Sequence, residues 1–266
     1  MLVSPRDEHG SGHKALEMTR IAVIGVGMGE PDHLTGQAVA ALNSVDVFFV
    51  LDKGSAADEL FHLRHDLCRR VITSHPYRFV DVEDPRRDRG AVDYGRAVAE
   101  WIATRAAALG EAIRRELGPD ERGGLLAWGD PAFYDSTLRV LDALPDPVDV
   151  EVVPGLSSIQ MLAAAHRISV TRVGRPVQVT TGRRLATCGF PPDCDDVVVM
   201  LDAECSFRDV DPAGVTIYWG AYLGSAHQIL ISGELAAVAH EIVAARADAK
   251  LRRGWVMDTY LLRRGS

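Results

Sequence analysis

The sequence lacks several features that would mark whole classes of protein. It has only four cysteines among 266 residues, and none of them stands at the paired spacing of a zinc site. No run of about 18 apolar residues occurs, so no membrane-spanning helix is predicted. The first 20 residues are charged throughout and have no apolar centre like that of a signal peptide. We therefore expect a cytoplasmic protein.

An excess of positive charge is also missing. The chain has 29 Lys and Arg against 37 Asp and Glu, which gives a net charge of −8 at pH 7. Binding to nucleic acid needs a positive surface, because the phosphates dominate its affinity. The acidic balance therefore argues against a nucleic-acid partner, and an anionic small molecule would need arginines that gather locally.

What the chain does have is an alternation of strand and helix patterns. Short apolar runs lie at 20–27, 46–52 and 123–131, and helical spacing of apolar residues lies between them at 34–45, 58–71, 93–117 and 135–144. This order predicts a mostly parallel sheet covered by helices. The polar segment 76–90, which contains prolines and many charges, is predicted to be a loop.

Two prolines within residues 144–149 interrupt the alternation and predict a linker. Beyond them, several strand patterns follow one another directly, which predicts a mixed sheet. The expected architecture is thus α/β with two domains, an N-terminal one at 20–146 and a C-terminal one at 147–266. Residues 1–19 are predicted to form a disordered extension.

The first strand ends in the glycine-rich stretch GVGMGE (25–30). In a dinucleotide-binding loop the third glycine stands one position later, and the helix that follows offers its free N–H groups to a pyrophosphate. Here Glu30 and Asp32 would repel that phosphate. The motif therefore argues against a nicotinamide cofactor and favours a ligand with positive charge and no phosphate, such as S-adenosylmethionine (SAM).

Two further turns follow strands and precede helices, WGDP (128–131) and PGLSS (154–158). A turn at the carboxyl end of a strand is where open α/β sheets bind ligands. Each turn by itself is common, and Ser157 with Gln160 also forms a capping box that gives the serine a structural role.

The order of these motifs resembles the tetrapyrrole (corrin/porphyrin) methylase family. The resemblance covers roughly residues 20–265, and most members have Pro and Asp where this chain has Met28 and Glu30. It implies two α/β domains with SAM in the cleft between them, and a homodimer. The stretches that carry it are Gly25–Thr35, Gly129–Tyr134, Pro154–Ser158 and Val197–Met200.

The same resemblance implies an activity and a set of cofactor contacts. The activity is a SAM-dependent methylation in cobalamin biosynthesis, at ring carbon 1 of precorrin-5, with release of acetate. No metal is implied, and we expect His62 and His65, three apart on a helical pattern, to lie on an exposed surface. The expected SAM contacts are Met28, Trp128, Gly129, Asp130, Phe133, Ser157, Ser158, Met200 and Leu223.

Release of an acetyl group requires attack by water on a carbonyl carbon, which a general base can assist. Asp52, at the end of the second predicted strand, is the best candidate, and Tyr94 is a weaker one. The carboxylates of a tetrapyrrole need arginines, because a guanidinium pairs with a carboxylate through two hydrogen bonds. The candidates are Arg86, Arg183 and Arg184.

Other functions stay open at this point. Related SAM-dependent methylases act on other precorrin carbons, on RNA or on protein side chains. A SAM-binding module without catalysis is compatible with the sequence as well. A dehydrogenase is disfavoured by Glu30, for the reason given above.

Overall fold

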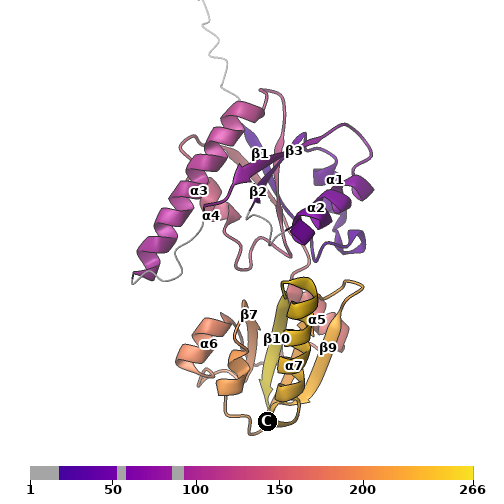
Figure 1. Cartoon of the computed structure of the whole chain (residues 1–266), viewed down its shortest axis with the longest axis vertical. Coiled ribbons are helices and arrows are strands. Elements are labelled where there is room, and N and C mark those ends of the chain that lie inside the picture. The colour runs from indigo at the N-terminus through magenta and orange to yellow at the C-terminus, as the bar shows by residue number, and fades with distance from the viewer. Residues whose placement is uncertain (1–17, 53–57, 86–92, 266) are drawn as a thin grey trace, which may run out of the picture.

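The computed structural model describes residues 18–52, 58–85 and 93–265. Within these residues the chain forms two five-stranded sheets with helices, which make up the two lobes seen in Figure 1. The predicted α/β class, with a mostly parallel first sheet and a mixed second sheet, is confirmed. Arg86 and most of the extension expected at 1–19 lie outside the described residues. In the part that is described, no helix is both long enough and apolar enough to cross a membrane.

The first sheet has the strand order β3-β2-β4-β1-β5, and its strand pairs are parallel. Thr35 caps α1 by accepting a hydrogen bond from the Ala38 N–H at 3.0 Å, as its position in the sequence predicts. The elements of this lobe are β1 (Arg20–Gly25), η1 (Pro31–His33), α1 (Gly36–Leu42), β2 (Val47–Asp52), α2 (Asp58–Val71), β3 (Arg78–Glu83), α3 (Tyr94–Glu116), β4 (Gly123–Ala127), α4 (Thr137–Asp142) and β5 (Asp149–Val153).

Helices cover both faces of the first sheet. Ile21 and Val23 of β1 pack in one apolar cluster with α3 and α4, whereas Ala22 and Ile24 pack in another with α1 and α2. Figure 1 shows these two pairs of helices on opposite sides of the sheet. Because successive residues of a strand face opposite sides, burial on both faces makes the whole strand apolar. This is why β1 is recognisable as an unbroken apolar run.

The prediction of a loop at 76–90 is wrong for residues 78–83, which form β3. This strand lies at the edge of the sheet and pairs in parallel with β2, from Val47 opposite Arg78 to Asp52 opposite Glu83. Most of its side chains are partly or fully exposed. An edge strand that faces solvent tolerates charged residues, so its sequence resembles that of a loop.

Strand β5 lies in the first sheet and not in the C-terminal domain for which it was predicted. It pairs in parallel with β1, from Arg20 opposite Asp149 to Ile24 opposite Val153. The prolines of 144–149 therefore belong to the turn between α4 and β5. Among the described residues the chain passes from the first sheet to the second once, between β5 and α5, and we propose this passage as the domain boundary.

The second sheet has the order β6-β7-β10-β8-β9, in which β6 and β7 are parallel and the other neighbours antiparallel. On one face Trp219 and Tyr260 are fully buried against α7, and on the other Leu162 of α5 packs on Leu261. The elements are α5 (Ser158–His166), β6 (Val177–Thr181), α6 (Gly182–Cys188), β7 (Asp196–Met200), η3 (Ser206–Asp209), β8 (Val215–Ala221), β9 (Ile229–Glu234), α7 (Leu235–Arg253) and β10 (Asp258–Arg264).

Three glycines bring the backbone into close contact where β4, β1 and β5 end. A Cβ atom on Gly155 would lie 2.9 Å from the Cα of Gly25 and closer still to the carbonyl oxygen of Gly129. Such distances are too short for any real side chain. Packing between backbones therefore requires glycine at 25 and 155, whereas at Gly129 the left-handed φ of +68° favours glycine. Each of the three glycines belongs to one of the three sequence motifs.

We predict that Gly155→Ala lowers the free energy of unfolding by about 1–3 kcal/mol, because the added methyl group must push two backbone segments apart. Urea unfolding followed by circular dichroism measures the change. Gly36→Ala is the matched control, since a Cβ there meets no atom within 4 Å and Ala favours a helix. Equal unfolding midpoints for the two variants would contradict the packing argument.

Candidate functional site

The first two motifs are joined through their backbones. Gly27 and Gly129 form an antiparallel bridge in which each N–H donates to the carbonyl oxygen of the other, at 3.1 and 2.6 Å. Gly29 has a φ of +92°, and a Cβ there would lie 2.7 Å from Cζ3 of Trp128. Glycine at 29 thus permits both the left-handed turn and the close approach of the indole ring.

The second motif is joined to the third through Asp130. Its Oδ2 accepts a hydrogen bond from the Gly155 N–H at 2.9 Å, and its Oδ1 accepts one from the Ala132 N–H at 2.8 Å. Ser157 caps α5 in the predicted capping box with Gln160. The polar atoms of Asp130 and Ser157 are therefore occupied in shaping these loops.

A cavity of about 330 Å³, which we call the motif cavity, lies against the three loops. This volume falls in the range of small-molecule sites, about 300–1,000 Å³. Leu223 is the one member of the expected SAM-binding set that does not line it. Those that do are Met28, Trp128, Gly129, Asp130, Phe133, Ser157, Ser158 and Met200.

The motif cavity has an acidic lining. Asp130, Asp135 and Asp258 are among its lining residues, and no Lys, Arg or His stands among the described ones. Such a lining disfavours a phosphate and favours a cation, because like charges repel at short range in a medium of low dielectric constant. Among the described residues, no group of three or more His, Cys, Asp and Glu is placed to hold a metal ion.

Strained backbone gathers around the same cavity. Tyr134 and Leu201 line it with left-handed φ values of 51° and 54°, and Tyr222, beside a neighbouring cavity, has a φ of 48°. Residues other than glycine rarely adopt this conformation, which concentrates at functional sites. The surrounding fold thus holds Tyr134, Leu201 and Tyr222 in an unfavourable backbone conformation beside these two adjoining cavities.

The wall contributed by β10 is fixed by a buried ion pair. Nε of Arg246 lies 2.9 Å from Oδ2 of Asp258, and the indole N–H of Trp219 donates to the same oxygen at 3.0 Å. The two charged side chains are only 12% and 7% exposed. Burial raises the pKa of Asp258, while the positive charge of Arg246 and the hydrogen bonds oppose this shift.

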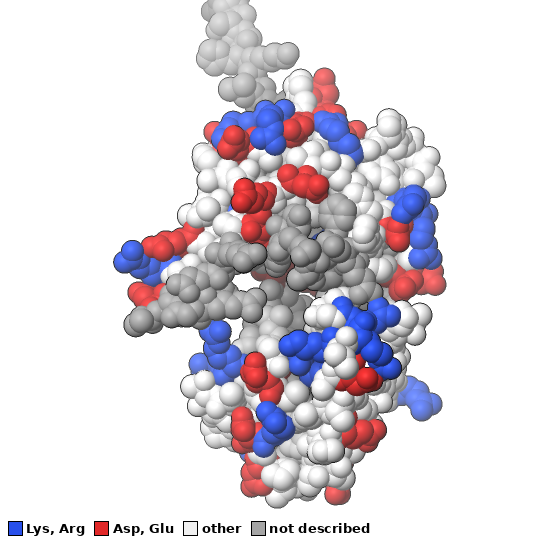
Figure 2. Space-filling view, in the orientation of Figure 1, with Lys and Arg blue, Asp and Glu red and all other residues white. Residues whose placement is uncertain are grey.

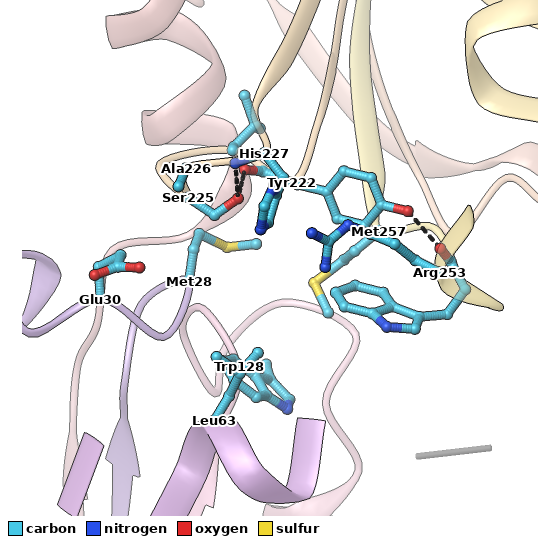
Figure 3. A pocket seen from close by; sticks show the side chains of 12 residues that line it. Met28, Glu30, Leu63, Trp128, Tyr222, Ser225, Ala226, His227, Arg253 and Met257 are labelled. Atoms are coloured by element: carbon cyan, nitrogen blue, oxygen red, sulfur yellow. Dashed lines mark hydrogen bonds between the residues drawn. The ribbon is translucent and has the colours of Figure 1, made fainter. Parts of the chain in front are cut away.

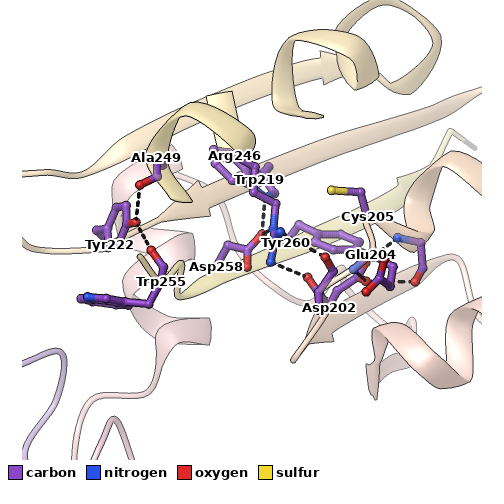
Figure 4. A network of polar contacts seen from close by, with 12 residues as sticks. Asp202, Glu204, Cys205, Trp219, Tyr222, Arg246, Ala249, Trp255, Asp258 and Tyr260 are labelled. Carbon is purple, nitrogen blue, oxygen red and sulfur yellow. Dashed lines mark hydrogen bonds and ion pairs between the residues drawn. The ribbon is translucent and has the colours of Figure 1, made fainter. Parts of the chain in front are cut away.

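A second carboxylate extends this network to the end of β7 (Figure 4). Asp202 accepts hydrogen bonds from the Tyr260 hydroxyl at 2.6 Å and from Ser206 N–H at 2.6 Å. Nη2 of Arg246 donates to the carbonyl oxygen of Asp202 at 3.1 Å. The loop that follows Met200 is thereby tied to both α7 and β10.

A smaller cavity of about 150 Å³ adjoins the motif cavity and shares Met28, Trp128 and Met257 with it. Figure 3 shows the side chains of Met28 and Met257 between Trp128 on one side and Tyr222 on the other. Leu223 is buried and lines this cavity. The structure therefore places Leu223 beside the expected site, next to the other residues of that set.

Apart from Arg86, the candidate catalytic and substrate-binding residues lie on β2 in the upper lobe, on α3 and on α6. Asp52 ends β2 as predicted, and its side chain lies outside the described part of the structure. Tyr94 begins α3 and is 49% exposed, and the guanidinium carbon of Arg183 lies 4.8 Å from the centre of its ring. Arg184 is exposed on the same helix α6 as Arg183. Tyr94 and Arg183 thus meet across the two lobes.

Sequence reasoning missed part of the lining of the motif cavity. Tyr134 and Asp135 directly follow the second motif, and their position could have included them. The start of β10 carried no motif, because only its antiparallel pairing between β7 and β8 brings it there. The omitted residues are Tyr134, Asp135, Leu201, Met257, Asp258 and Thr259.

Comparison with known proteins identifies the family. The family model of the Tetrapyrrole (Corrin/Porphyrin) Methylases matches residues 20–239, so the chain belongs to this family and is a methyltransferase by class. A relative from Sinorhizobium sp, named precorrin-6A synthase [deacetylating], is 43% identical over 253 residues, which are 94% of this chain and 97% of the relative.

Solved structures agree with this assignment. A cobalamin synthesis related protein (CobF) from Corynebacterium diphtheriae is 33% identical with a TM-score of 0.75, over 93% of this chain and 99% of its own. A uroporphyrin-III C-methyl transferase from Thermus thermophilus, complexed with S-adenyl homocysteine, has a TM-score of 0.55 at 18% identity, over 92% of both chains. The second likeness shows the fold alone.

We predict that Arg246→Met lowers the free energy of unfolding by about 3–5 kcal/mol, because it leaves the buried carboxylate of Asp258 without its cation. Urea unfolding at pH 7 measures the loss. The deficit should shrink as the pH falls, because loss of Arg246 raises the pKa of Asp258 further and the folded variant then gains more from binding a proton there than the unchanged protein does. Arg252→Met, on an exposed ion pair of the same helix, should cost less than about 1 kcal/mol. Equal losses in both variants would contradict this reading of the ion pair.

Proposed function

We propose that the protein is a SAM-dependent C-methyltransferase of cobalamin biosynthesis, which methylates precorrin-5 at ring carbon 1 and releases acetate to give precorrin-6A. The relative that is 43% identical over 94% of the chain carries the name of this activity. Identity at this level over nearly the whole chain supports a shared substrate as well as a shared fold.

The motif cavity is the single observation that carries the assignment of the cofactor. Residues of all three family motifs line it, together with Asp135 and Asp258, and no basic residue stands among its described lining residues. Arg246 pairs with Asp258 from outside this lining, so Asp130 and Asp135 supply its negative charge. SAM fits such a lining because it bears a sulfonium cation and no phosphate. The apolar side chains of Met28, Phe133 and Met200 would hold its uncharged parts.

When bound, SAM supplies a methyl group that is already activated by the positive sulfur. The protein then has to hold the ring carbon and the methyl group in line, and orientation of this kind can lower a barrier by about 7–11 kcal/mol. The ordered loops around Asp130 and Ser157 provide a rigid floor for that purpose. We retain Asp52 as the general base that assists attack of water on the acetyl carbonyl, and Tyr94 as a second candidate.

The substrate side of the site needs positive charge. Figure 2 shows Lys and Arg side chains on the part of the lower lobe that borders the upper lobe, a smaller group at the left over α6 and a larger one at the right over the end of α7. The whole chain nevertheless has a net charge of −8. Arg183 and Arg184 of α6 are our candidates for contacts with the carboxylates of the tetrapyrrole, and Arg86 is a third. From the family resemblance we also propose a homodimer in the cytoplasm.

The decisive experiment incubates the purified protein with precorrin-5 and SAM that carries an isotope-labelled methyl group. We expect labelled precorrin-6A, S-adenosylhomocysteine and acetate in equal amounts, measured by mass spectrometry and an acetate assay. Methyl transfer without acetate would indicate a methylase of another precorrin carbon. Binding of S-adenosylhomocysteine without any transfer would indicate a non-catalytic SAM-binding module.

We predict that Arg183→Ala weakens binding of the tetrapyrrole about 10- to 100-fold, because one hydrogen bond to a charged group is worth about 1.5–3 kcal/mol. Fluorescence titration with a porphyrin polycarboxylate measures this change, and calorimetry should find the affinity for S-adenosylhomocysteine unchanged. Arg175→Ala is the control, since Arg175 precedes β6 whereas Arg183 follows it. Equal loss of both ligands in Arg183→Ala would overturn the role of Arg183.

A further inference from the structure

A third cavity lies next to Trp128, at the carboxyl ends of β2 and β4. It has a volume of about 260 Å³ and is bounded by α2 through Arg64 and by α3 through Trp101 and Arg105. We call it the Arg64 cavity. It shares Trp128, Tyr134 and Asp135 with the motif cavity, so the two spaces have a common wall. None of the sequence motifs includes Arg64.

The guanidinium of Arg64 has no acceptor among the residues that the structure describes. Its central carbon lies 5.1 Å from the centre of the Trp128 ring, and no hydrogen bond or ion pair joins it to any described residue. Burial lowers the pKa of Arg64 to about 10, with Asp135 acting in the opposite direction. Arg64 therefore keeps its positive charge at neutral pH.

A second donor without an acceptor lies beside it. The indole Nε1 of Trp128 is buried and has no hydrogen-bond partner in the described structure. The six-membered ring of Trp128 packs on Gly29, so the N–H lies at the opposite edge of the indole. In Figure 3 this nitrogen points away from Met28 and Tyr222. Buried donors are nearly always paired in native proteins, and a bound ligand can supply the missing acceptor.

The other charged groups of the Arg64 cavity already have partners. Nε of Arg105 lies 2.8 Å from Oδ1 of Asp84, and its Nη1 donates to the Ser136 hydroxyl at 2.6 Å. Asp135 accepts a hydrogen bond from the Thr137 N–H at 2.6 Å and lies beyond ion-pair distance from Arg64. Arg64 and the indole N–H of Trp128 therefore remain available to a ligand.

We propose that the Arg64 cavity is a carboxylate subsite, in which Arg64 and the indole N–H of Trp128 hold one side-chain carboxylate of the tetrapyrrole substrate. The proposal rests on the function proposed above. A guanidinium binds a carboxylate through two parallel hydrogen bonds, which fix direction as well as position. Trp128 separates this subsite from the motif cavity, so a substrate anchored here is oriented relative to the methyl donor.

The subsite also provides selectivity between tetrapyrroles. A substrate that lacks the carboxylate leaves the buried indole N–H of Trp128 and the half-buried guanidinium of Arg64 unpaired. Sites of this kind reject such analogues more strongly than apolar pockets reject a missing methylene. The Arg64 cavity therefore distinguishes substrates by the pattern of acidic side chains around the ring.

The first test uses acetate as a probe and needs no substrate. The melting temperatures of the full-length protein and of Arg64→Met, Trp128→Phe and Arg69→Met are measured in sodium acetate and in sodium chloride at equal ionic strength. Arg69 is the matched control because it lies on the same helix α2 and is exposed. We expect acetate to raise the melting temperature of the unchanged protein and of Arg69→Met by about 2–4 °C more than that of the other two. The same effect of acetate in all four proteins would overturn the subsite.

The second test measures turnover of precorrin-5. We expect Arg64→Met to raise KM at least about tenfold with little change in kcat, and Arg64→Lys, which keeps the charge but loses the planar fork, to lie between. Unchanged KM in a folded Arg64→Met protein would overturn the assignment to substrate. If the unchanged protein fails to convert precorrin-5, the proposed function fails, and the melting test still decides whether the carboxylate subsite exists.

Discussion

The close approach of Gly25, Gly129 and Gly155 is the contact on which the rest of the structure depends. It brings the ends of three neighbouring strands together so tightly that the loops after them have to leave the sheet in fixed directions. The bridge between Gly27 and Gly129 and the hydrogen bond from Gly155 to Asp130 are then possible. The floor of the motif cavity is therefore shaped first by backbone packing, and its side chains add to a loop geometry that is already set.

The opposite wall of the motif cavity depends on buried charge. Asp258 and Asp202 stand at the ends of different segments, and Arg246 of α7 reaches both of them. A hydrogen bond of 2.8 Å between the hydroxyls of Thr259 and Ser158 then connects β10 to α5. Packing between glycine backbones thus fixes one wall of the motif cavity, and a network of polar side chains fixes the other. The cavity is therefore rigid on both sides.

Local sequence patterns predict much of this architecture. The apolar runs of β1 and β2, the cap at Thr35 and the capping box at Ser157 depend on residues that are close in sequence, so they could be predicted. The edge strand β3 could not, because solvent on its outer side removes the apolar pattern. The sheet to which β5 belongs could not either, because pairing with β1 is not encoded within the strand itself. For the same reason Met257, Asp258 and Thr259 were missed, and Arg64 had no motif around it.

The passage of the chain between the two sheets has a consequence for how the protein can vary. The segment from Pro154 to Ser157 connects the lobes, and its last residue, Ser157, lines the motif cavity. Connections between domains usually accept insertions, because few contacts depend on their length. Here an added residue would displace Gly155 from Asp130 and Ser157 from its cap. The length of this connection is therefore as tightly constrained as the identity of any residue in the site, and the lobes are kept at a fixed spacing by the loop that shapes the site.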